Sequence, residues 1–250
     1  VLEENKEYVI SGKKIPIRNH GSGCNYSASI AVSLARGKTI QNAVKTAKNY
    51  VYQSIRQSEK IGKGVNITHK NISNEVKELS DSINYFKQMK NIYKVIPECQ
   101  TNFVFAKKNP KSVMDVLGIS GRLVKSGREV VTAGEIVYGG SQHVGTAVIQ
   151  VCKKFPGIRS GLNIKYESKI ISNAKKSNFT VLNYDRSKEP KKLKQKENSS
   201  ISWGISNCLN SKSPDIIYHK GDIGKEPMIL IFGNNPSEIM QKVSKLRLAH

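Results

Sequence analysis

The chain has few of the residues from which compact ligand sites are most easily recognised. Its four cysteines, Cys24, Cys99, Cys152 and Cys208, lie far apart, so they indicate neither a zinc site nor a disulfide scaffold. The five histidines are equally scattered and show no metalloprotease spacing. No apolar stretch approaches the roughly 20 residues that cross a bilayer; the longest candidate, 228–232, is strand-sized. These absences argue against a membrane-spanning protein and against a metal-cluster protein.

Arginine is scarce, although the chain is strongly basic. Lys+Arg number 41 against 19 Asp+Glu, which gives a formal net charge of +22. Such a charge invites a nucleic-acid interpretation, but only eight of these residues are Arg, and the densest basic run, 188–196, contains no aromatic residue for base stacking. We therefore interpret the lysine excess as a solvated surface or a biased composition. It is compatible with anionic small-molecule substrates, and we expect no nucleic-acid partner.

The chain begins Val-Leu-Glu-Glu-Asn, without an initiator Met or an apolar leader. We expect a cytoplasmic protein, and we interpret the 250 residues as a possible fragment whose true start is missing. Hydrophobic residues make up 38% of the chain, which is enough to bury a core.

The N-terminal part predicts a strand pair followed by helices. Residues 8–18 resemble a β-hairpin, and apolar residues at helical spacing follow over 27–58, where Gly37 is expected to divide two helices. A further helical pattern over 73–95 is expected to connect the two parts of the chain.

From residue 102 onward, short β-rich runs alternate with helical stretches. Strands are predicted at 102–106, 130–133, 179–183, 215–218 and 228–232, and helices near 141–155, 168–177, 200–211 and 236–247. This alternation predicts an α/β or α+β domain.

The turn 20–24 reads His-Gly-Ser-Gly-Cys and precedes a helical pattern. Its glycines allow the backbone amides of Gly21, Ser22 and Gly23 to face a phosphate, and the helix N-terminus adds partial positive charge. Cys24 ends the turn, where the helix dipole would acidify a thiol. By spacing alone, a plain helix cap and an inert buried thiol are the alternative interpretations.

With the helical stretch 27–35, the stretch 43–51 and Gly62-Lys63-Gly64, this turn resembles the C-terminal end of hydroxymethylpyrimidine/phosphomethylpyrimidine kinases, the ThiD family of the ribokinase-like fold. The resemblance covers about residues 8–69. It implies an anion hole at the glycine turn, ATP as the phosphoryl donor and Cys24 as the base on the accepting oxygen. Most of the pyrimidine pocket of such a kinase lies outside this chain, so we expect no kinase activity from the 250 residues alone.

A second set of motifs is spread over the C-terminal part. Gly140 and Ser141 precede an apolar-periodic run, which predicts a helix N-terminus able to hold an anion, with His143 in its first turn. Arg122 follows a glycine, so its guanidinium could reach phosphate oxygens. A capping or surface role for His143 and an ordinary ion pair for Arg122 remain open at this point.

Two further pairs of charged residues, Lys225-Glu226 and Asp185-Arg186, lie at the ends of predicted strands. Gly221-x-x-Gly224-Lys225 lacks the spacing and the Ser or Thr of a phosphate-binding P-loop, and it is predicted to form a strand-to-strand turn. Lys225 and Glu226 are then either a positioned pair or a hairpin salt bridge. Asp185 and Arg186 follow a predicted strand, where ligand contacts are common, although a loop ion pair explains them equally well.

Taken in order over about residues 72–248, these segments resemble the ThiN-type thiamine-phosphate synthase domain, which in archaeal proteins follows such a kinase. The resemblance implies an α/β fold of the class II aldolase type: three α/β/α layers around a mixed, mostly antiparallel sheet. The expected domains are a ribokinase-like fragment, 1–70, and a synthase domain, 71–250.

The resemblance also implies a transferase of thiamine biosynthesis that joins hydroxymethylpyrimidine diphosphate to hydroxyethylthiazole phosphate, with Mg²⁺ and a possible homodimer. It maps the family's essential residues onto Arg122 and His143. The chain departs from the family pattern at Gln100, at Glu189 and at His219-Lys220. The alternative function is a thiamine-phosphate-sensing domain of a transcriptional regulator. The expected substrate-binding residues of this domain are Asn102, Gly140, Ser141, Asn163, Asp185, Arg186, Lys225 and Glu226.

Overall fold

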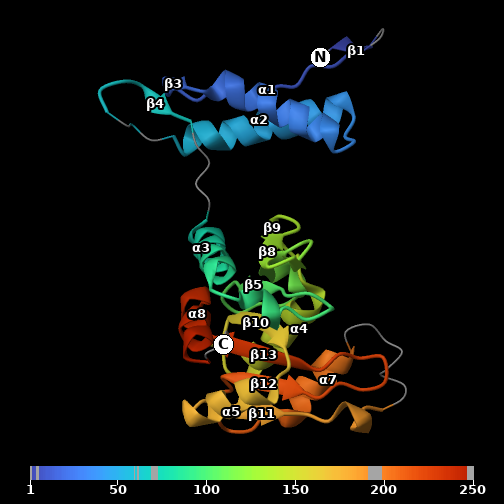
Figure 1. The fold of residues 1–250 in the computed structure, drawn as a ribbon. Coiled ribbons are helices and arrows are strands. Elements are labelled where there is room, and N and C mark those ends of the chain that lie inside the picture. Colours follow the sequence, from blue (N-terminus) through green and yellow to red (C-terminus); the bar gives the residue numbers. More distant parts are fainter. Residues whose placement is uncertain are drawn as a thin grey trace. The chain divides into compact units, whose positions relative to one another are not determined.

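A computed structural model of the chain describes residues 2–3, 6–58, 60, 62–68, 73–190 and 199–246. The chain divides into two compact units, Val1–Ser73 and Asn74–His250 (Figure 1). Most of the predicted basic run 188–196 lies outside the described residues. Within the described ranges, every helix is too short or too polar to cross a membrane.

The first unit is built on two helices, α1 (Ser22–Ala35) and α2 (Ile40–Arg56), which pack together. The predicted division is confirmed, because Gly37 between them has φ 76°, in the left-handed region that glycine adopts readily. Helix α2 begins at Thr39, whose side chain accepts the Asn42 N–H, and it buries one apolar face. Two short strand pairs accompany the helices: β1 (Leu2–Glu3) with β2 (Lys6–Glu7), and β3 (Asn19–His20) with β4 (Asn66–Ile67).

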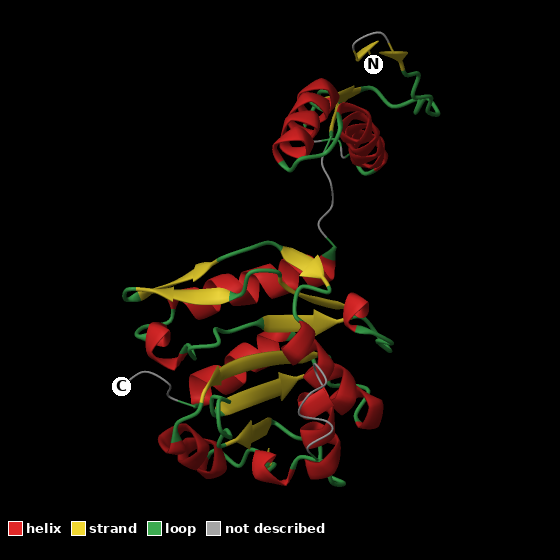
Figure 2. Ribbon diagram, turned by 90° about the vertical axis from the view of Figure 1, so that its right-hand side faces the viewer, coloured by secondary structure: helices red, strands yellow, loops and turns green. Residues whose placement is uncertain are grey.

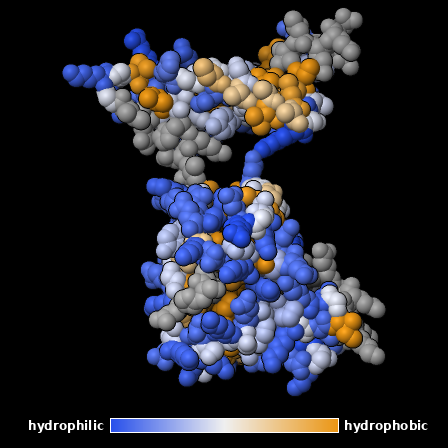
Figure 3. Space-filling model, viewed as in Figure 1, coloured by the Kyte–Doolittle hydropathy of each residue, from blue (hydrophilic) through white to orange (hydrophobic). Residues whose placement is uncertain are grey.

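Helix α1 leaves much of its apolar surface uncovered. Val32 is 50% exposed and Leu34 41% exposed, and Figure 3 shows hydrophobic side chains on the surface of this unit. Ser33 is the residue that α1 buries fully. The pair α1–α2 therefore shields only part of its apolar surface.

The predicted β-hairpin over residues 8–18 is wrong. This segment forms no strand, and Val9 is 83% exposed. Pro16 lacks the N–H that a ladder requires, and an isolated two-stranded hairpin is marginally stable in water. No neighbouring strand among the described residues supports this segment.

The second unit contains a seven-stranded sheet in the order β11-β12-β13-β10-β5-β6-β9 (Figure 2). Only β11 and β12 pair in parallel; the other neighbours are antiparallel. A separate hairpin is formed by β7 (Leu123–Ser126) and β8 (Glu129–Thr132). The sheet strands are β5 (Phe103–Ala106), β6 (Val116–Ile119), β9 (Ile136–Tyr138), β10 (Ser160–Lys165), β11 (Val181–Asn183), β12 (Ile216–His219) and β13 (Met228–Gly233).

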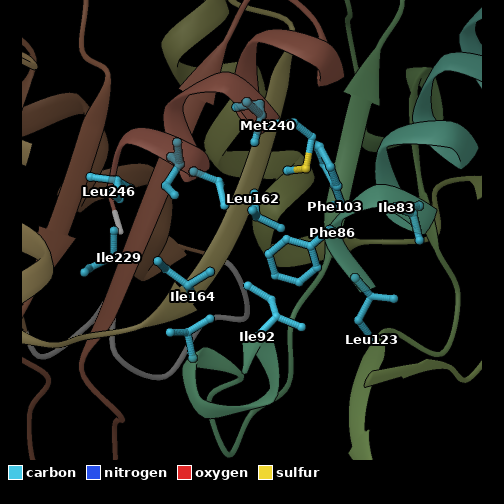
Figure 4. Close-up of a cluster of buried hydrophobic side chains, with 14 of the residues drawn as sticks. Ile83, Phe86, Ile92, Phe103, Leu123, Leu162, Ile164, Ile229, Met240 and Leu246 are labelled. Carbon is cyan, nitrogen blue, oxygen red and sulfur yellow. The ribbon is translucent and has the colours of Figure 1, made fainter. Parts of the chain in front are cut away.

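Helices cover both faces of this sheet. On one face, α3 (Asn74–Gln88), α5 (Ser168–Lys176) and α8 (Pro236–Lys245) contribute to one core cluster, part of which Figure 4 shows. On the other face, α4 (Gln142–Lys154) and α7 (Ser199–Cys208) contribute to a second cluster. Because side chains alternate along a strand, Phe103 of β5 enters the first cluster and Val104 the second. The predicted α/β fold with three layers and a mixed, mostly antiparallel sheet is confirmed.

The prediction that residues 73–95 connect the two parts is wrong. Helix α3 belongs to the second unit, where Leu79, Ile83 and Phe86 are buried in the core and the helix packs against α8. The helical pattern itself is confirmed, with a break at Asn91 (φ 58°) before the 3-10 turn Ile92–Val95. The apolar face of α3 is buried in the core of the second unit, so exposing it would cost free energy. Such a helix is part of the domain and not a linker.

Candidate active site

A cavity of about 1110 Å³ lies in the second unit, where several chain segments that are distant in sequence meet. Most of the predicted synthase-site residues line it: Asn102, Arg122, Gly140, Ser141, His143, Asn163, Arg186, Lys225 and Glu226. They come from the residue before β5, the β6–β7 connection, the start of α4, β10, the 3-10 turn Arg186–Lys188 and the β12–β13 turn.

Arg122 lies between β6 and β7 with φ 69°, an unusual backbone conformation for a side-chain-bearing residue. Its Nη1 donates to the carbonyl of Cys99, across the cavity wall. A guanidinium carries five N–H donors in a fixed fork, so this bond orients the group and leaves other donors for a ligand.

Glu226 fixes the opposite wall instead of pairing with Lys225. Its Oε1 accepts the N–H of Glu98 at 2.9 Å, and its Oε2 accepts the N–H of Cys99 at 2.9 Å. Among the described residues, no salt bridge joins Lys225 to Glu226, so the hairpin salt-bridge interpretation is wrong. Glu226 thus attaches the predicted strand-to-strand turn, which the structure confirms between β12 and β13, to the segment before β5.

Asn102 and Asn163 use their amides to hold the cavity floor. The Asn102 side chain donates to the Ile119 carbonyl at 2.8 Å and accepts the Ile119 N–H at 3.0 Å. Asn163 Oδ1 accepts the Asn102 N–H at 2.6 Å, and its Nδ2 donates to the Gln100 carbonyl at 2.9 Å. These contacts make both residues positioning residues; direct substrate contact by either stays a prediction.

The N-terminus of α4 opens into the cavity. Ser141 is its N-cap residue, and the first turn contains no acidic side chain that would compete with an anion. Gly140 lets this turn approach β6, because a Cβ there would lie 2.2 Å from the Gly118 carbonyl oxygen. Close backbone packing against β6 thereby fixes the start of α4 at the edge of the cavity.

His143 lies in the first turn of α4 and is surrounded by cations. Burial, followed by the charges of Arg186, Arg122 and Lys225, lowers its pKa from 6.5 to about 4. Its Nε2 is buried and has no hydrogen-bond partner in the part of the chain that the structure describes. His143 is therefore neutral at neutral pH while the cavity holds no anion.

His219, at the end of β12, is a cavity residue that the sequence analysis did not select. It is 2% exposed, and its Nδ1 accepts the N–H of Gly221 at 3.2 Å. Burial, followed by the charges of Arg186 and His143, lowers its pKa to about 3. The available signal was its position two residues before the Gly221 motif, where the chain departs from the family pattern.

Arg186 is buried beneath the cavity and pairs with Glu189 at 3.7 Å. Glu189 also accepts a hydrogen bond from the Ser200 hydroxyl. Asp185 is not among the cavity residues. Its exposed carboxylate accepts the N–H and the hydroxyl of Ser187 at 2.9 and 2.7 Å, and so caps the following turn. An ion pair therefore does hold Arg186, but with Glu189 in place of Asp185.

The glycine turn of the first unit differs from the prediction in two details. Helix α1 begins at Ser22, so Ser22, Gly23 and Cys24 form its first turn, after Gly21 with φ 93°. Cys24 is exposed, so the interpretation of Cys24 as a buried thiol is wrong. Thr68 donates from its hydroxyl to the His20 carbonyl at 2.9 Å and thereby ties β4 to the turn.

The cavity residues do not form a resident metal site. Within the described ranges, no group of three or more His, Cys, Asp and Glu side chains is arranged to hold an ion. Both oxygens of Glu226 already accept backbone N–H groups. The donors are instead cations and amides, which suit an anion.

Together, these features define a three-layer α/β domain with a cavity whose cationic side chains and helix N-terminus suit an anionic ligand. A family model described as "Thiamine-phosphate synthase ThiN" matches residues 78–245, and one described as "Phosphomethylpyrimidine kinase" matches residues 1–69. The chain belongs to the ThiN thiamine-phosphate synthase family and carries a phosphomethylpyrimidine kinase segment before that domain.

Two curated relatives share this organisation in whole or in part. The bifunctional thiamine biosynthesis protein ThiDN of Methanocaldococcus jannaschii is 33% identical over 243 residues, which are 94% of this chain and 56% of that protein. The chain thus spans little more than half the length of that relative. Thiamine-phosphate synthase ThiN of Methanothermobacter thermautotrophicus is 38% identical over 154 residues, which are 61% of this chain and 81% of that protein.

A solved structure, the C-terminal domain of a phosphomethylpyrimidine kinase, is 40% identical and superposes with a TM-score of 0.65. The superposition covers 69% of this chain and 97% of that solved chain.

Proposed function

We propose that the cavity joins hydroxymethylpyrimidine diphosphate to hydroxyethylthiazole phosphate and releases thiamine phosphate and pyrophosphate. The observation that carries this proposal is the convergence of Arg122, Arg186 and Lys225 with the α4 N-terminus around His143, in a domain of the ThiN family.

The reaction makes one bond and breaks one bond. The bond between the pyrimidine methylene carbon and the diphosphate oxygen breaks, and its electron pair leaves with pyrophosphate. The resulting cation is stabilised by the aminopyrimidine ring, and the thiazole nitrogen then donates its lone pair to the same carbon. The protein must chiefly stabilise a leaving group with about three negative charges, for which fixed cations and amide dipoles are suited.

His143 acts in this scheme as a group whose protonation responds to the substrate. Arg186, Arg122 and Lys225 lower its pKa in the free site. A bound diphosphate opposes the field of these cations, so it raises the His143 pKa. The imidazole can then donate a hydrogen bond or a proton to the departing oxygen.

Mg²⁺ was expected from the family resemblance, but the donor set does not fit a resident ion. The protein's own cations therefore neutralise the charge of the leaving group in this scheme.

The direct test is product formation. The chain is mixed with both substrates and Mg²⁺, and thiamine phosphate and pyrophosphate are measured by chromatography. A folded chain that binds thiamine phosphate but forms none would favour the alternative function, a sensor domain of a regulator. A kinase segment precedes the synthase domain, where a regulator requires a DNA-binding segment, and this argues for the enzyme.

For the longer protein, we propose a bifunctional enzyme in which the kinase part uses ATP and the exposed Cys24 acts as the base. A homodimer and a cytoplasmic location belong to the same proposal. The pyrimidine and thiazole phosphates are its proposed partners, in agreement with the cationic cavity.

A further inference from the structure

Of the buried polar atoms without a hydrogen-bond partner among the described residues, three belong to residues that line the cavity: His143 Nε2, His219 Nε2 and Arg186 Nε. Buried polar groups in native proteins are nearly always paired. Three such atoms in residues that line one cavity therefore indicate groups kept for a ligand. The proposed function uses His143 and Arg186 on the diphosphate and leaves His219 without a role.

The turn that follows β12 fixes the tautomer of His219. Its Nδ1 accepts the Gly221 N–H, so that nitrogen carries no proton and the ring proton lies on Nε2. An imidazolium would place a proton on Nδ1, against the Gly221 N–H, and would lose this hydrogen bond. The turn therefore keeps His219 neutral, whereas no such bond restricts His143 within the described residues.

The neighbours of His219 act in the same direction. The ring lies 5.1 Å from the ring of Tyr184, and the positive charge of Arg186 opposes a second cation nearby. His219 is thus a buried, uncharged donor in a cavity that also contains three cationic side chains. The cations are the stronger partners for phosphate oxygens, and a neutral donor matches an uncharged acceptor.

We propose that His219 is a substrate-binding residue whose Nε2–H donates a hydrogen bond to a ring nitrogen of the pyrimidine substrate. This inference rests on the proposed function, because it deepens the assignment of the same cavity. It gives the cavity two regions of different chemistry: cations for the diphosphate and a neutral donor for the ring.

The test uses two substitutions, one that keeps the acceptor of the imidazole and one that keeps its donor. In His219→Asn, the side-chain oxygen replaces Nδ1 as acceptor for Gly221, and the donor toward the ligand is lost. In His219→Gln, the amide nitrogen reaches the position of Nε2 and keeps that donor. Glu129→Gln, at an exposed position of β8 away from the cavity, is the control.

Calorimetry with hydroxymethylpyrimidine phosphate and, separately, with inorganic pyrophosphate distinguishes the two regions. We expect His219→Asn to weaken binding of the pyrimidine phosphate about tenfold and to leave pyrophosphate binding unchanged. His219→Gln should recover most of the pyrimidine affinity, and Glu129→Gln should match the wild type. In turnover assays, the KM for the pyrimidine substrate should rise while the KM for the thiazole phosphate stays constant.

Equal pyrimidine affinity in His219→Asn and the wild type would overturn the inference, as would an equal loss for both ligands. If the wild-type chain makes thiamine phosphate and His219→Asn has the same KM for the pyrimidine substrate, only the role of His219 is refuted. Wild-type chain that makes no product, yet binds the pyrimidine in a manner dependent on His219, would refute the synthase function and retain the inference. Absence of pyrimidine binding by the wild type would refute both.

Discussion

The carboxylate of Glu226 accepts the backbone N–H of Cys99 at 2.9 Å and so joins the β12–β13 turn to the segment that precedes β5. Arg122 donates to the carbonyl of the same Cys99. One peptide segment is therefore held between an anion and a cation of the cavity. Burial, together with the hydrogen bond and charge of Glu226, raises the pKa of the Cys99 thiol to about 11, so this thiol is not a nucleophile at neutral pH.

Removing Glu226 should disturb the cavity without removing a ligand contact. We expect Glu226→Ala to lower kcat/KM about tenfold, because the N–H groups of Glu98 and Cys99 lose their acceptor and Cys99 no longer positions Arg122. Glu226→Gln keeps one acceptor oxygen and should lose less. Glu129→Ala, at an exposed position of β8, is the control. Equal activity of all three variants in a thiamine phosphate assay would contradict this role.

Arg122 and His143 should each be required for catalysis. We expect Arg122→Ala and His143→Ala each to lower kcat about 10²–10³-fold, which is typical for the loss of one preorganised contact to developing charge. Arg128→Ala, on the exposed turn of the β7–β8 hairpin, should retain full activity. Near-normal turnover by both cavity variants would show that the site is assigned wrongly.

Acid should destabilise the second unit through its two buried histidines. Their folded-state pKa values, about 4 for His143 and about 3 for His219, lie below the 6.5 of an ordinary histidine. Between pH 6.5 and these values the unfolded chain binds more protons, so the free energy of unfolding decreases as pH falls through this window. Urea titrations from pH 7.5 to 4 should show this decrease, and pyrophosphate should oppose it. A His143→Gln/His219→Gln double variant with the wild-type slope would argue against this origin.

Gly140, just before helix α4, should tolerate no side chain, whereas Gly145 inside that helix should. A Cβ at Gly140 would lie 2.2 Å from a backbone oxygen, and one at Gly145 would make ordinary contacts at 3.7 Å. We expect Gly140→Ala to reduce the free energy of unfolding by about 1–3 kcal/mol and to impair turnover. Gly145→Ala, inside helix α4, should be neutral or stabilising by up to about 1 kcal/mol. Urea denaturation followed by circular dichroism distinguishes the two.

The 250-residue chain should show no pyrimidine kinase activity. Residues 1–69 match only a segment of the kinase family, and helix α1 leaves apolar side chains such as Val32 uncovered. Incubation with hydroxymethylpyrimidine and radiolabelled ATP should yield no phosphorylated product. A Cys24→Ser chain is the control for background hydrolysis, and turnover that depends on Cys24 would refute the prediction.

Much of the fold can be predicted from local sequence patterns, but the central strand of the sheet cannot. The helices near 141–155 and 236–247 were predicted because their apolar spacing is strong. Strand β10, in the middle of the sheet, was missed because Gly161 and Asn163 interrupt the β-rich pattern. Both have tertiary reasons: a Cβ at Gly161 would lie 2.6 Å from Val148, and Asn163 bonds the cavity floor. Such contacts join distant segments and leave no periodic signal.

The site was predicted to a similar extent. Sequence motifs selected Arg122 and His143, which line the same cavity, because glycine turns and helix starts have local signatures. Asp185 was selected for its place after a strand, yet it caps its own turn. The sequence signal at His219 was only a departure from the family pattern, because the role proposed for this residue depends on burial and on one backbone N–H.

The walls of the cavity come from both ends of the synthase domain. The Glu98–Glu226 hydrogen bond alone spans 128 positions of the chain, and strands β5, β10 and β13, on which the walls rest, are neighbours only in the finished sheet. A piece that lacks either of these two end segments therefore cannot assemble the site, and ligand affinity should appear late in refolding. During refolding, the return of pyrophosphate binding would then show when the whole sheet has formed.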